Sequence, residues 1–159
     1  MLKYFNYDIV FQEIPDEVTL AINFSLCPNK CPGCHSPWLW EDRGEELDEQ
    51  TLVNLISVYD GSFTCLAFMG GDNDPKAVNK LAKFVKENFK NIKTAWYSGK
   101  DCLSEDIEEK YFDYIKTGGY KKELGSLKDK TTNQRLWKYN SNGEKEDITY
   151  RFQKKYFSY

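Results

Sequence analysis

The chain has little of what marks several large classes of protein. It has a single histidine, and its 22 Lys and Arg residues are outnumbered by 25 Asp and Glu residues, for a net charge of −3. A nucleic-acid-binding domain usually carries a basic excess, so this balance gives no reason to expect one. No apolar run approaches the ~20 residues that a membrane-spanning helix needs. We therefore expect neither nucleic acid nor a membrane among the partners.

A targeting pattern is also missing from the N-terminal residues. The stretch MLKYFNYDIVFQEIPDE is interrupted by acidic residues, unlike a secretory signal peptide or an Arg-rich transit sequence. We therefore expect a cytoplasmic protein, in a compartment where thiols stay reduced. The length of 159 residues suits one domain, residues 1–159, that buries a core without disulfides.

Short strand patterns alternate with helix patterns along most of the chain. Runs rich in β-branched, aromatic and apolar residues predict the strands, and apolar residues at helical spacing predict the helices. Strands are expected at 7–13, 17–25, 63–69, 92–97 and 111–118, and helices at about 48–59, 75–89 and 104–111. Such alternation predicts a parallel sheet, open or curved.

Two of the predicted helices also carry start signals, and the tail has a different pattern. Asp48 is a plausible N-cap for the first helix, and Pro75 suits the first turn of the second. Near the C-terminus, RLWKYN at 135–140 and DITYRFQ at 147–153 flank Gly143. Two such runs around a glycine turn predict a C-terminal β-hairpin.

The most informative stretch is SLCPNKCPGCHSP, residues 25–37, which holds Cys27, Cys31 and Cys34 with C-x3-C-x2-C spacing. Its prolines and glycine predict a loop that leaves the carboxyl end of an early strand. Five cysteines, three of them crowded together, fit a metal site better than a disulfide framework. Cys65 and Cys102 are expected to be packing thiols.

Two kinds of metal centre suit three thiolates. Zinc needs four ligands, and His35 is a candidate for the fourth, but the adjacent residues Cys34 and His35 rarely both reach one tetrahedral ion. In a 4Fe–4S cluster, three cysteines leave one iron open, and an open iron can bind a small molecule. The cysteine pattern therefore favours a catalytic cluster, with a structural zinc loop as the alternative.

Two further loops are expected at the same edge of the sheet. GGDNDP begins at Gly70, after strand 63–69, and YSGK begins at Tyr97, at the end of strand 92–97. The carboxyl ends of parallel strands lie at one edge, where active sites gather. Gly70 and Gly71 alone would indicate only a tight turn, but the cysteine motif upstream favours a binding role.

These motifs together resemble a known family. C-x3-C-x2-C after an early strand is similar to the cluster motif of the radical S-adenosylmethionine enzymes. CPGC, GGD and the segment ELGSLKDKTTNQRLW resemble the branch that activates anaerobic ribonucleoside-triphosphate reductases, over about residues 7–137. The resemblance implies an α/β fold, an incomplete (βα) barrel of the radical SAM type with a C-terminal β-hairpin. Its open side would admit a protein substrate.

The resemblance also implies the ligands of two cofactors. Three residues would hold a 4Fe–4S cluster whose fourth iron binds S-adenosylmethionine: Cys27, Cys31 and Cys34. Three more would receive the amino group of the methionine moiety: Gly70, Gly71 and Asp72. Glycines let the backbone approach closely, and carbonyl groups accept hydrogen bonds from an ammonium group.

Two departures from the superfamily pattern affect the rest of the cofactor site. Many members have an aromatic residue where this chain has Gly33, so adenine would be held by backbone groups of Gly33, Cys34 and His35. Many members also have Glu where this chain has Asp72. Ser98, with its neighbours in YSGK, is placed to reach the ribose.

The activity implied is glycyl-radical activation of an anaerobic ribonucleoside-triphosphate reductase, with the electron supplied by a flavodoxin-like donor. Two alternatives stay open: an activating enzyme for another glycyl-radical enzyme, of the formate-lyase type, and a non-catalytic zinc or iron–sulfur module that mediates interactions. Trp38 and Trp40 either shield the cluster, touch a partner or pack in the core. The segment Thr131–Arg135 either orders the cofactor pocket, contacts the reductase or only leads into the hairpin.

Overall fold

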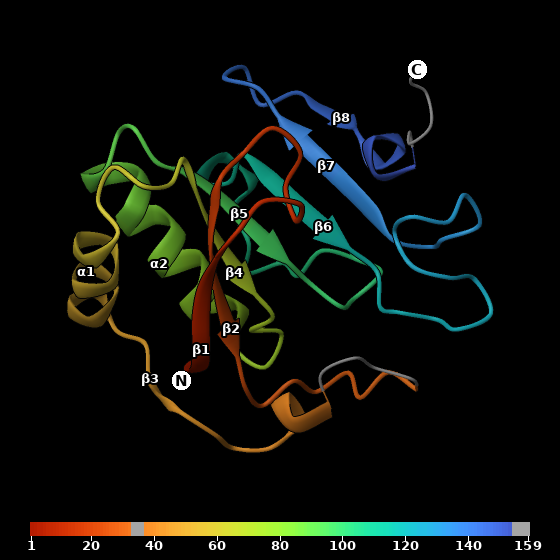
Figure 1. The fold of residues 1–159 in the computed structure, drawn as a ribbon, viewed down its shortest axis with the longest axis horizontal. Helices are drawn as coiled ribbons and strands as arrows, with labels where there is room; N and C mark the ends of the chain where they lie inside the picture. The colour runs from red at the N-terminus through yellow and green to blue at the C-terminus, as the bar shows by residue number, and fades with distance from the viewer. Residues whose placement is uncertain (33–36, 154–159) are drawn as a thin grey trace.

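The computed structural model describes residues 1–32 and 37–153, and one eight-stranded sheet forms its centre (Figure 1). The strands lie in the order β3-β1-β2-β4-β5-β6-β7-β8. Their bounds are β1 Lys3–Val10, β2 Thr19–Phe24, β3 Glu45–Glu46, β4 Cys65–Met69, β5 Lys93–Tyr97, β6 Tyr114–Thr117, β7 Arg135–Tyr139 and β8 Lys145–Asp147. The central four, β2, β4, β5 and β6, run parallel, which confirms the parallel sheet expected from the alternating pattern.

Antiparallel strands flank this parallel centre. β1 and β3 lie on one side, and β7 and β8 lie on the other. The incomplete (βα) barrel stays a prediction, since the described residues form one sheet with two α-helices. Neither helix in this part of the chain is long and apolar enough to cross a membrane.

The two α-helices form where the sequence predicted them. α1 spans Glu49–Val58 after the N-cap Asp48, whose carboxylate accepts a hydrogen bond from Thr51 N at 2.8 Å. α2 spans Pro75–Asn88, with Pro75 in its first turn and Asp74 as the N-cap. Both helices bury apolar residues against one face of the sheet, in a cluster that includes Leu52, Ile56, Leu66, Phe68, Val78, Leu81 and Trp96.

The predicted helix at 104–111 is wrong except for its end. Only a 3-10 turn, η2 at Glu109–Tyr111, forms there. Ile107 is the one buried residue of the segment 104–111, so the segment has no apolar stripe with which a helix could pack on the sheet.

The C-terminal hairpin forms, but its second strand lies earlier than predicted, because β8 shares only Asp147 with the expected segment 147–153. β7 pairs with β8, and Gly143 occupies the turn with a φ of 81°. The residues that follow form a 3-10 turn, η3 at Thr149–Phe152, instead of continuing the strand. Asp147 accepts hydrogen bonds from both N and Oγ1 of Thr149, at 3.0 and 2.6 Å, and this local pairing competes with strand extension.

The second face of the sheet is covered without an α-helix. Its buried cluster consists of Ile14, Cys65, Ala67, Ala95, Tyr114, Leu136 and Ile148, with Met69, Tyr97 and Phe152 partly buried against it. Ile14 comes from the β1–β2 loop, and Phe152 comes from η3. Cys65, Ala67 and Ala95 are the small residues of this cluster, and a loop and a turn lie over this side. We call it the helix-free face.

Candidate metal centre

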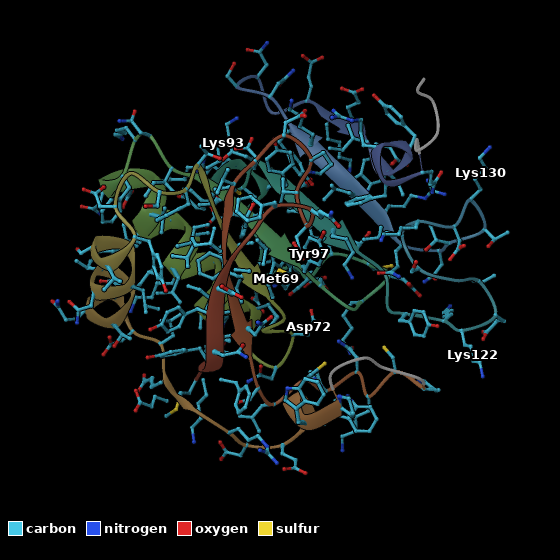
Figure 2. All side chains as sticks on the ribbon, viewed as in Figure 1. Met69, Asp72, Lys93, Tyr97, Lys122 and Lys130 are labelled. Atoms are coloured by element: carbon cyan, nitrogen blue, oxygen red, sulfur yellow. The ribbon has the colours of Figure 1, made fainter. Side chains whose placement is uncertain are left out.

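Three loops meet at the carboxyl edge of the parallel strands, as the sequence predicted. The cysteine loop follows β2, the loop that begins at Gly70 follows β4, and the Ser98-Gly99 turn follows β5. Figure 2 shows Asp72 at this edge, between the sheet and the segment that carries the cysteines.

Asp72 joins all three loops through its carboxylate. Its Oδ2 accepts hydrogen bonds from Asn29 Nδ2 and Gly99 N, both at 2.7 Å. Its Oδ1 accepts from Ser98 Oγ at 2.6 Å. A carboxylate offers about four acceptor positions, so about one remains for another donor. Asp72 therefore positions the loops, and its predicted role toward a methionine amino group stays a prediction.

Cys27 and Cys31 are free, half-buried thiols in a strained loop. Leu26 and Lys30, the residues directly before them, have positive φ values of 60° and 43°. Left-handed backbone at a residue other than glycine costs about 1–3 kcal/mol and persists where surrounding structure imposes it. Because the same unusual backbone conformation precedes each cysteine, we infer that it sets the orientation of both thiols.

A glycine from a fourth segment packs against this loop. A Cβ atom added to Gly119, which follows β6, would lie 3.0 Å from Cys31 Sγ and 2.9 Å from Gly99 O. Real Cβ atoms essentially never approach as closely as this contact with Gly99 O, and the contact with Cys31 Sγ is tighter than most. Only glycine at this position lets the β6 end approach the cysteine loop and the β5 turn together.

Three of the predicted site residues, Gly33, Cys34 and His35, lie outside the described residues. Within the part of the chain that the structure describes, no group of three His, Cys, Asp or Glu side chains is placed to hold a metal ion. Cys34 therefore stays the predicted third ligand beside Cys27 and Cys31.

Gly70 and Gly71 have structural roles at this edge. Gly70, at φ 103°, donates its N–H to Tyr97 O at 3.0 Å and accepts from Trp96 Nε1 at 2.6 Å. A Cβ atom on Gly71, at φ 93°, would lie 2.7 Å from Val78 Cγ2. These contacts account for both glycines as a tight turn. Their predicted role in cofactor binding stays a prediction.

Ser98 is buried, and its hydroxyl already has two partners. It donates to Asp72 and accepts from Lys100 N at 3.1 Å. The hydroxyl thus fixes the β5 turn, and the predicted contact with a ribose is not tested by these bonds.

The sequence analysis missed Lys116, the third residue of β6. Its side chain is buried, with 7 % of the residue exposed. Nζ donates to Gly118 O at 2.9 Å and to Gln134 Oε1 at 3.1 Å, and it lies 5.2 Å from the centroid of the Tyr97 ring. No carboxylate forms an ion pair with it among the described residues. In the sequence, the only sign was a lysine inside a short apolar strand.

Electrostatics connects Lys116 to the cysteine loop. Burial lowers the pKa of its ammonium group to about 8, while the negative charges of Asp72, Cys31 and Cys27 act to raise it. A buried cation without a paired anion is costly. The site therefore favours negative charge, as thiolate ligands or as an anionic group of a bound molecule.

The two other cysteines differ from each other. Cys65 is fully buried in β4, and burial raises the pKa of its thiol, which confirms a packing role. Cys102 is exposed, so the prediction that it packs is wrong. It lies in the β5–β6 connection, beyond the end of β5 and outside the core.

The tryptophans after the cysteine loop lie in η1, Pro37–Trp40. Trp38 is 45 % exposed, which excludes a core position. The indole Nε1 of Trp40 is buried and has no hydrogen-bond partner among the described residues. A buried donor of this kind needs an acceptor that the described residues do not supply, and the sulfides of a cluster are acceptors.

Comparison with known proteins identifies the family of the chain. Residues 18–137, from the start of β2 into β7, match the model of the 4Fe-4S single cluster domain family. The match covers the cysteine loop and most of the chain, so the protein belongs to that family of iron–sulfur domains. Comparisons with curated proteins and with solved structures gave no match.

The residues present fit a 4Fe–4S cluster. Cys27 and Cys31 offer two free thiols on one loop. Trp40 Nε1 and Lys116 Nζ, which have no acceptor and no carboxylate partner, respectively, within residues 1–32 and 37–153, also suit an anionic, sulfur-rich group. Cys27 and Cys31, with Cys34, would hold it.

Proposed function

We propose that this chain is an activating enzyme of the radical S-adenosylmethionine type, which generates a glycyl radical on an anaerobic ribonucleoside-triphosphate reductase. One observation supports it above the others: Asp72 joins the cysteine loop to the two loops that follow β4 and β5. A cluster that only carried electrons would need the cysteine loop alone. The additional loops at the same edge suit a second, bound molecule.

The chemistry belongs to the bound cofactors. When bound, a reduced 4Fe–4S cluster and S-adenosylmethionine supply a hydrogen-atom abstraction: one electron enters, the C5′–S bond breaks, and methionine and 5′-deoxyadenosine are the products. The hydrogen atom comes from a glycine Cα of the reductase, and a flavodoxin-like protein supplies the electron.

The chain's own residues would orient this second molecule. Lys116, buried and without a paired carboxylate, suits the carboxylate of the methionine moiety. The acceptor position that remains on Asp72 suits its ammonium group, together with the carbonyl of Gly71. Burying a charged group in this way is favourable only when both charges are paired.

The sheet suits a protein substrate. The parallel strands β2, β4, β5 and β6 would form the curved part of an incomplete (βα) barrel, and the helix-free face would be its inner wall. An open barrel leaves a wide entrance through which a glycine loop of the reductase can reach the cofactor.

The test is reductive cleavage. The protein is reconstituted anaerobically with iron and sulfide, dithionite and S-adenosylmethionine are added, and 5′-deoxyadenosine and methionine are assayed. We expect cleavage by the wild type and none by Cys31→Ala. Cys65→Ala, which removes a thiol buried in β4 and not among the predicted ligands, is the matched control and should retain cleavage.

A non-catalytic module is the second candidate, since the matching family is described by its cluster alone. It predicts a protein that binds iron and sulfide, or zinc, and leaves S-adenosylmethionine intact. Loaded wild-type protein that gives no 5′-deoxyadenosine would contradict the activating-enzyme proposal. If cleavage occurs, an organic radical on added reductase, measured by electron paramagnetic resonance, identifies the substrate.

A further inference from the structure

A row of side chains crosses the helix-free face beside the metal centre. In the register of the parallel strands, Met69 of β4 pairs with Tyr97 of β5, and Tyr97 pairs with Lys116 of β6. Residues paired in this way point to the same face of a sheet. Figure 2 shows Met69 and Tyr97 close together near the carboxyl edge, on the sheet side of Asp72. The row therefore connects the face to the metal centre.

A cavity opens over this row. Its volume is about 350 Å³, and its walls come from the β1–β2 loop, the β6–β7 connection and η3. We call it the Tyr97 cavity; its lining residues are Gln12, Glu13, Tyr97, Tyr120, Ser126, Leu127, Lys128, Gln134 and Phe152. Tyr97 and Gln134 are also the residues that contact Lys116, so the cavity and the metal centre share two side chains.

The β6–β7 connection makes a well-ordered wall for this cavity. Ser126 N donates to Asp129 Oδ2 at 2.8 Å, and Thr131 Oγ1 donates to Leu124 O at 2.6 Å. Gln153 Nε2 donates to Leu127 O and Asp129 O at 3.3 and 3.2 Å, which fixes the connection to the η3 end. In Figure 2 Lys122 and Lys130 lie on the outer side of this connection, so the wall is polar outside and apolar at Leu127.

Two polar groups in the cavity lack partners. Glu13 Oε2 is buried and accepts no hydrogen bond among the described residues. Gln134 accepts from Lys116 through Oε1, but its Nε2 donates to none of the described residues. Beside the apolar side chains of Leu127 and Phe152 and the ammonium group of Lys128, the lining thus includes one acceptor and one donor without partners among the described residues. Unsatisfied groups of this kind indicate a ligand or an unseen water.

We propose that the Tyr97 cavity binds a short extended peptide segment of the protein substrate, in which Glu13 accepts a main-chain N–H and Gln134 donates to a main-chain carbonyl. The inference rests on the proposed function, because it assigns the place where the glycine segment lies relative to the metal centre. An extended peptide presents N–H and C=O groups in alternation, which matches one acceptor and one donor.

Size and charge favour this occupant. A cavity of about 350 Å³ is at the small end of ligand pockets, so it suits a few small residues and not a folded element. The carboxylate of Glu13 and the ammonium group of Lys128 both line the cavity, so the two opposite charges suit an uncharged peptide segment better than a strongly charged ligand. Tyr97, Leu127 and Phe152, which line the cavity, would keep water away from the bound segment during abstraction of a hydrogen atom from carbon.

The experiment measures peptide binding apart from chemistry. The probe is a short synthetic peptide centred on the radical glycine of an anaerobic ribonucleoside-triphosphate reductase, with that glycine deuterated at Cα. Its affinity for the cluster-loaded protein with S-adenosylmethionine is measured by calorimetry, and deuterium in 5′-deoxyadenosine is measured by mass spectrometry. Leu127→Trp fills the cavity, and Glu13→Gln removes the charged acceptor with little change of shape.

We expect each variant to weaken peptide binding by about tenfold or more and to lower deuterium transfer. Ser141→Trp places the same bulk in a different cavity, beside Phe112 and Tyr139, and Asp16→Asn changes an exposed carboxylate of the same loop. Both controls should bind the peptide as the wild type does. Circular dichroism and iron content show that each variant is folded and loaded.

The outcomes separate the two proposals. Peptide binding that is unchanged in Leu127→Trp and Glu13→Gln, or absent in the wild type, overturns the cavity assignment. Binding that depends on both residues supports it, even if S-adenosylmethionine is not cleaved, in which case the proposed function alone fails. Deuterium transfer that persists in both variants would support the proposed function and overturn the cavity assignment.

Discussion

The two ends of the parallel strands are each held by one carboxylate, and the two carboxylates have different partners. At the starting end, Glu17 accepts from Thr64 Oγ1, Lys93 Nζ and Tyr114 OH at 2.7, 2.8 and 2.8 Å. At the carboxyl end, Asp72 accepts from the three loops described above. Figure 2 shows Lys93 and Asp72 at opposite ends of the sheet.

The difference is in charge balance. The Glu17 side chain is 4 % exposed and is paired with a cation, Lys93. Asp72 accepts only from neutral donors, while the cation of that end, Lys116, is buried without an ion-pair partner in the described part of the chain. A buried group that lacks its counter-charge is costly unless a ligand supplies it. The buried charge at the starting end is therefore paired within the chain. At the carboxyl end, a bound anionic group would supply the counter-charge that Lys116 lacks among the described residues.

Glu17→Gln should have the largest effect on stability. It removes the charge that three donors share, and hydrogen bonds to charged groups contribute about 1.5–3 kcal/mol, so we expect the free energy of unfolding to fall by about 3 kcal/mol. Asp16→Asn, an adjacent carboxylate in an exposed ion pair with Arg151, should cost less than about 1 kcal/mol. Urea denaturation measures both, and equal losses would contradict the comparison.

Gly119→Ala should disturb the carboxyl end alone. Its Cβ atom would crowd Cys31 Sγ and Gly99 O, and overpacking costs about 1–3 kcal/mol. We expect lower iron content after reconstitution, together with this loss of stability. Gly143→Ala is the control, because open space surrounds that position and only backbone strain results. Full iron loading of Gly119→Ala would show that the cysteine loop moves freely.

Asp72→Asn should affect function more than stability. Asn keeps one carbonyl acceptor and loses the second, so we expect a loss of about 1 kcal/mol, smaller than that for Glu17→Gln. Because the three loops are then joined less firmly, iron content and S-adenosylmethionine cleavage should fall together. Wild-type iron content and wild-type cleavage in Asp72→Asn would show that Asp72 is not part of the functional site.

How much of this was predictable from the sequence depends on the range of each interaction. α1, α2 and β4 follow from caps and apolar patterns, which are local. The meeting of the three loops also followed, because parallel strands place their carboxyl ends together. The helix at 104–111 was wrong because burial, which the sequence does not display, decides whether a weak pattern forms a helix.

Lys116 and Glu17 were missed for a different reason. Each is a single charged residue whose role depends on partners far away in the chain, such as Gln134 for Lys116 and Lys93 for Glu17. Those pairings follow from strand register, which one sequence does not specify. The cysteine motif was found because its spacing is itself local.

The pH dependence of stability tests the starting end. Burial acts to raise the pKa of Glu17, but the hydrogen bonds from Lys93, Thr64 and Tyr114 outweigh it and leave the pKa below the ordinary value of 4.5. A lowered carboxyl pKa gives stability that is present above the unfolded value and is lost as the pH falls through the folded value. Between pH 7 and about pH 3, wild type should therefore lose more stability than Glu17→Gln. Parallel curves would contradict this assignment.

Lys116→Met should have the smallest effect on the stability of the metal-free protein, and it separates the two ends most sharply. Met at this position removes the cost of a buried charge but leaves Gly118 O and Gln134 Oε1 without their donor, so we expect a net change close to zero. Lys93→Met should destabilise, because it leaves Glu17 without its cation. In the cluster-loaded protein, Lys116→Met should instead have a larger effect on the metal centre than Lys93→Met. Removing the positive charge of Lys116 near the thiolates should lower the reduction potential of the cluster, measured by redox titration, and Lys116→Arg should restore part of it. If Lys116→Met destabilises the metal-free protein as much as Lys93→Met does, the charge of Lys116 is already balanced within the chain, and the proposed difference between the two ends is wrong.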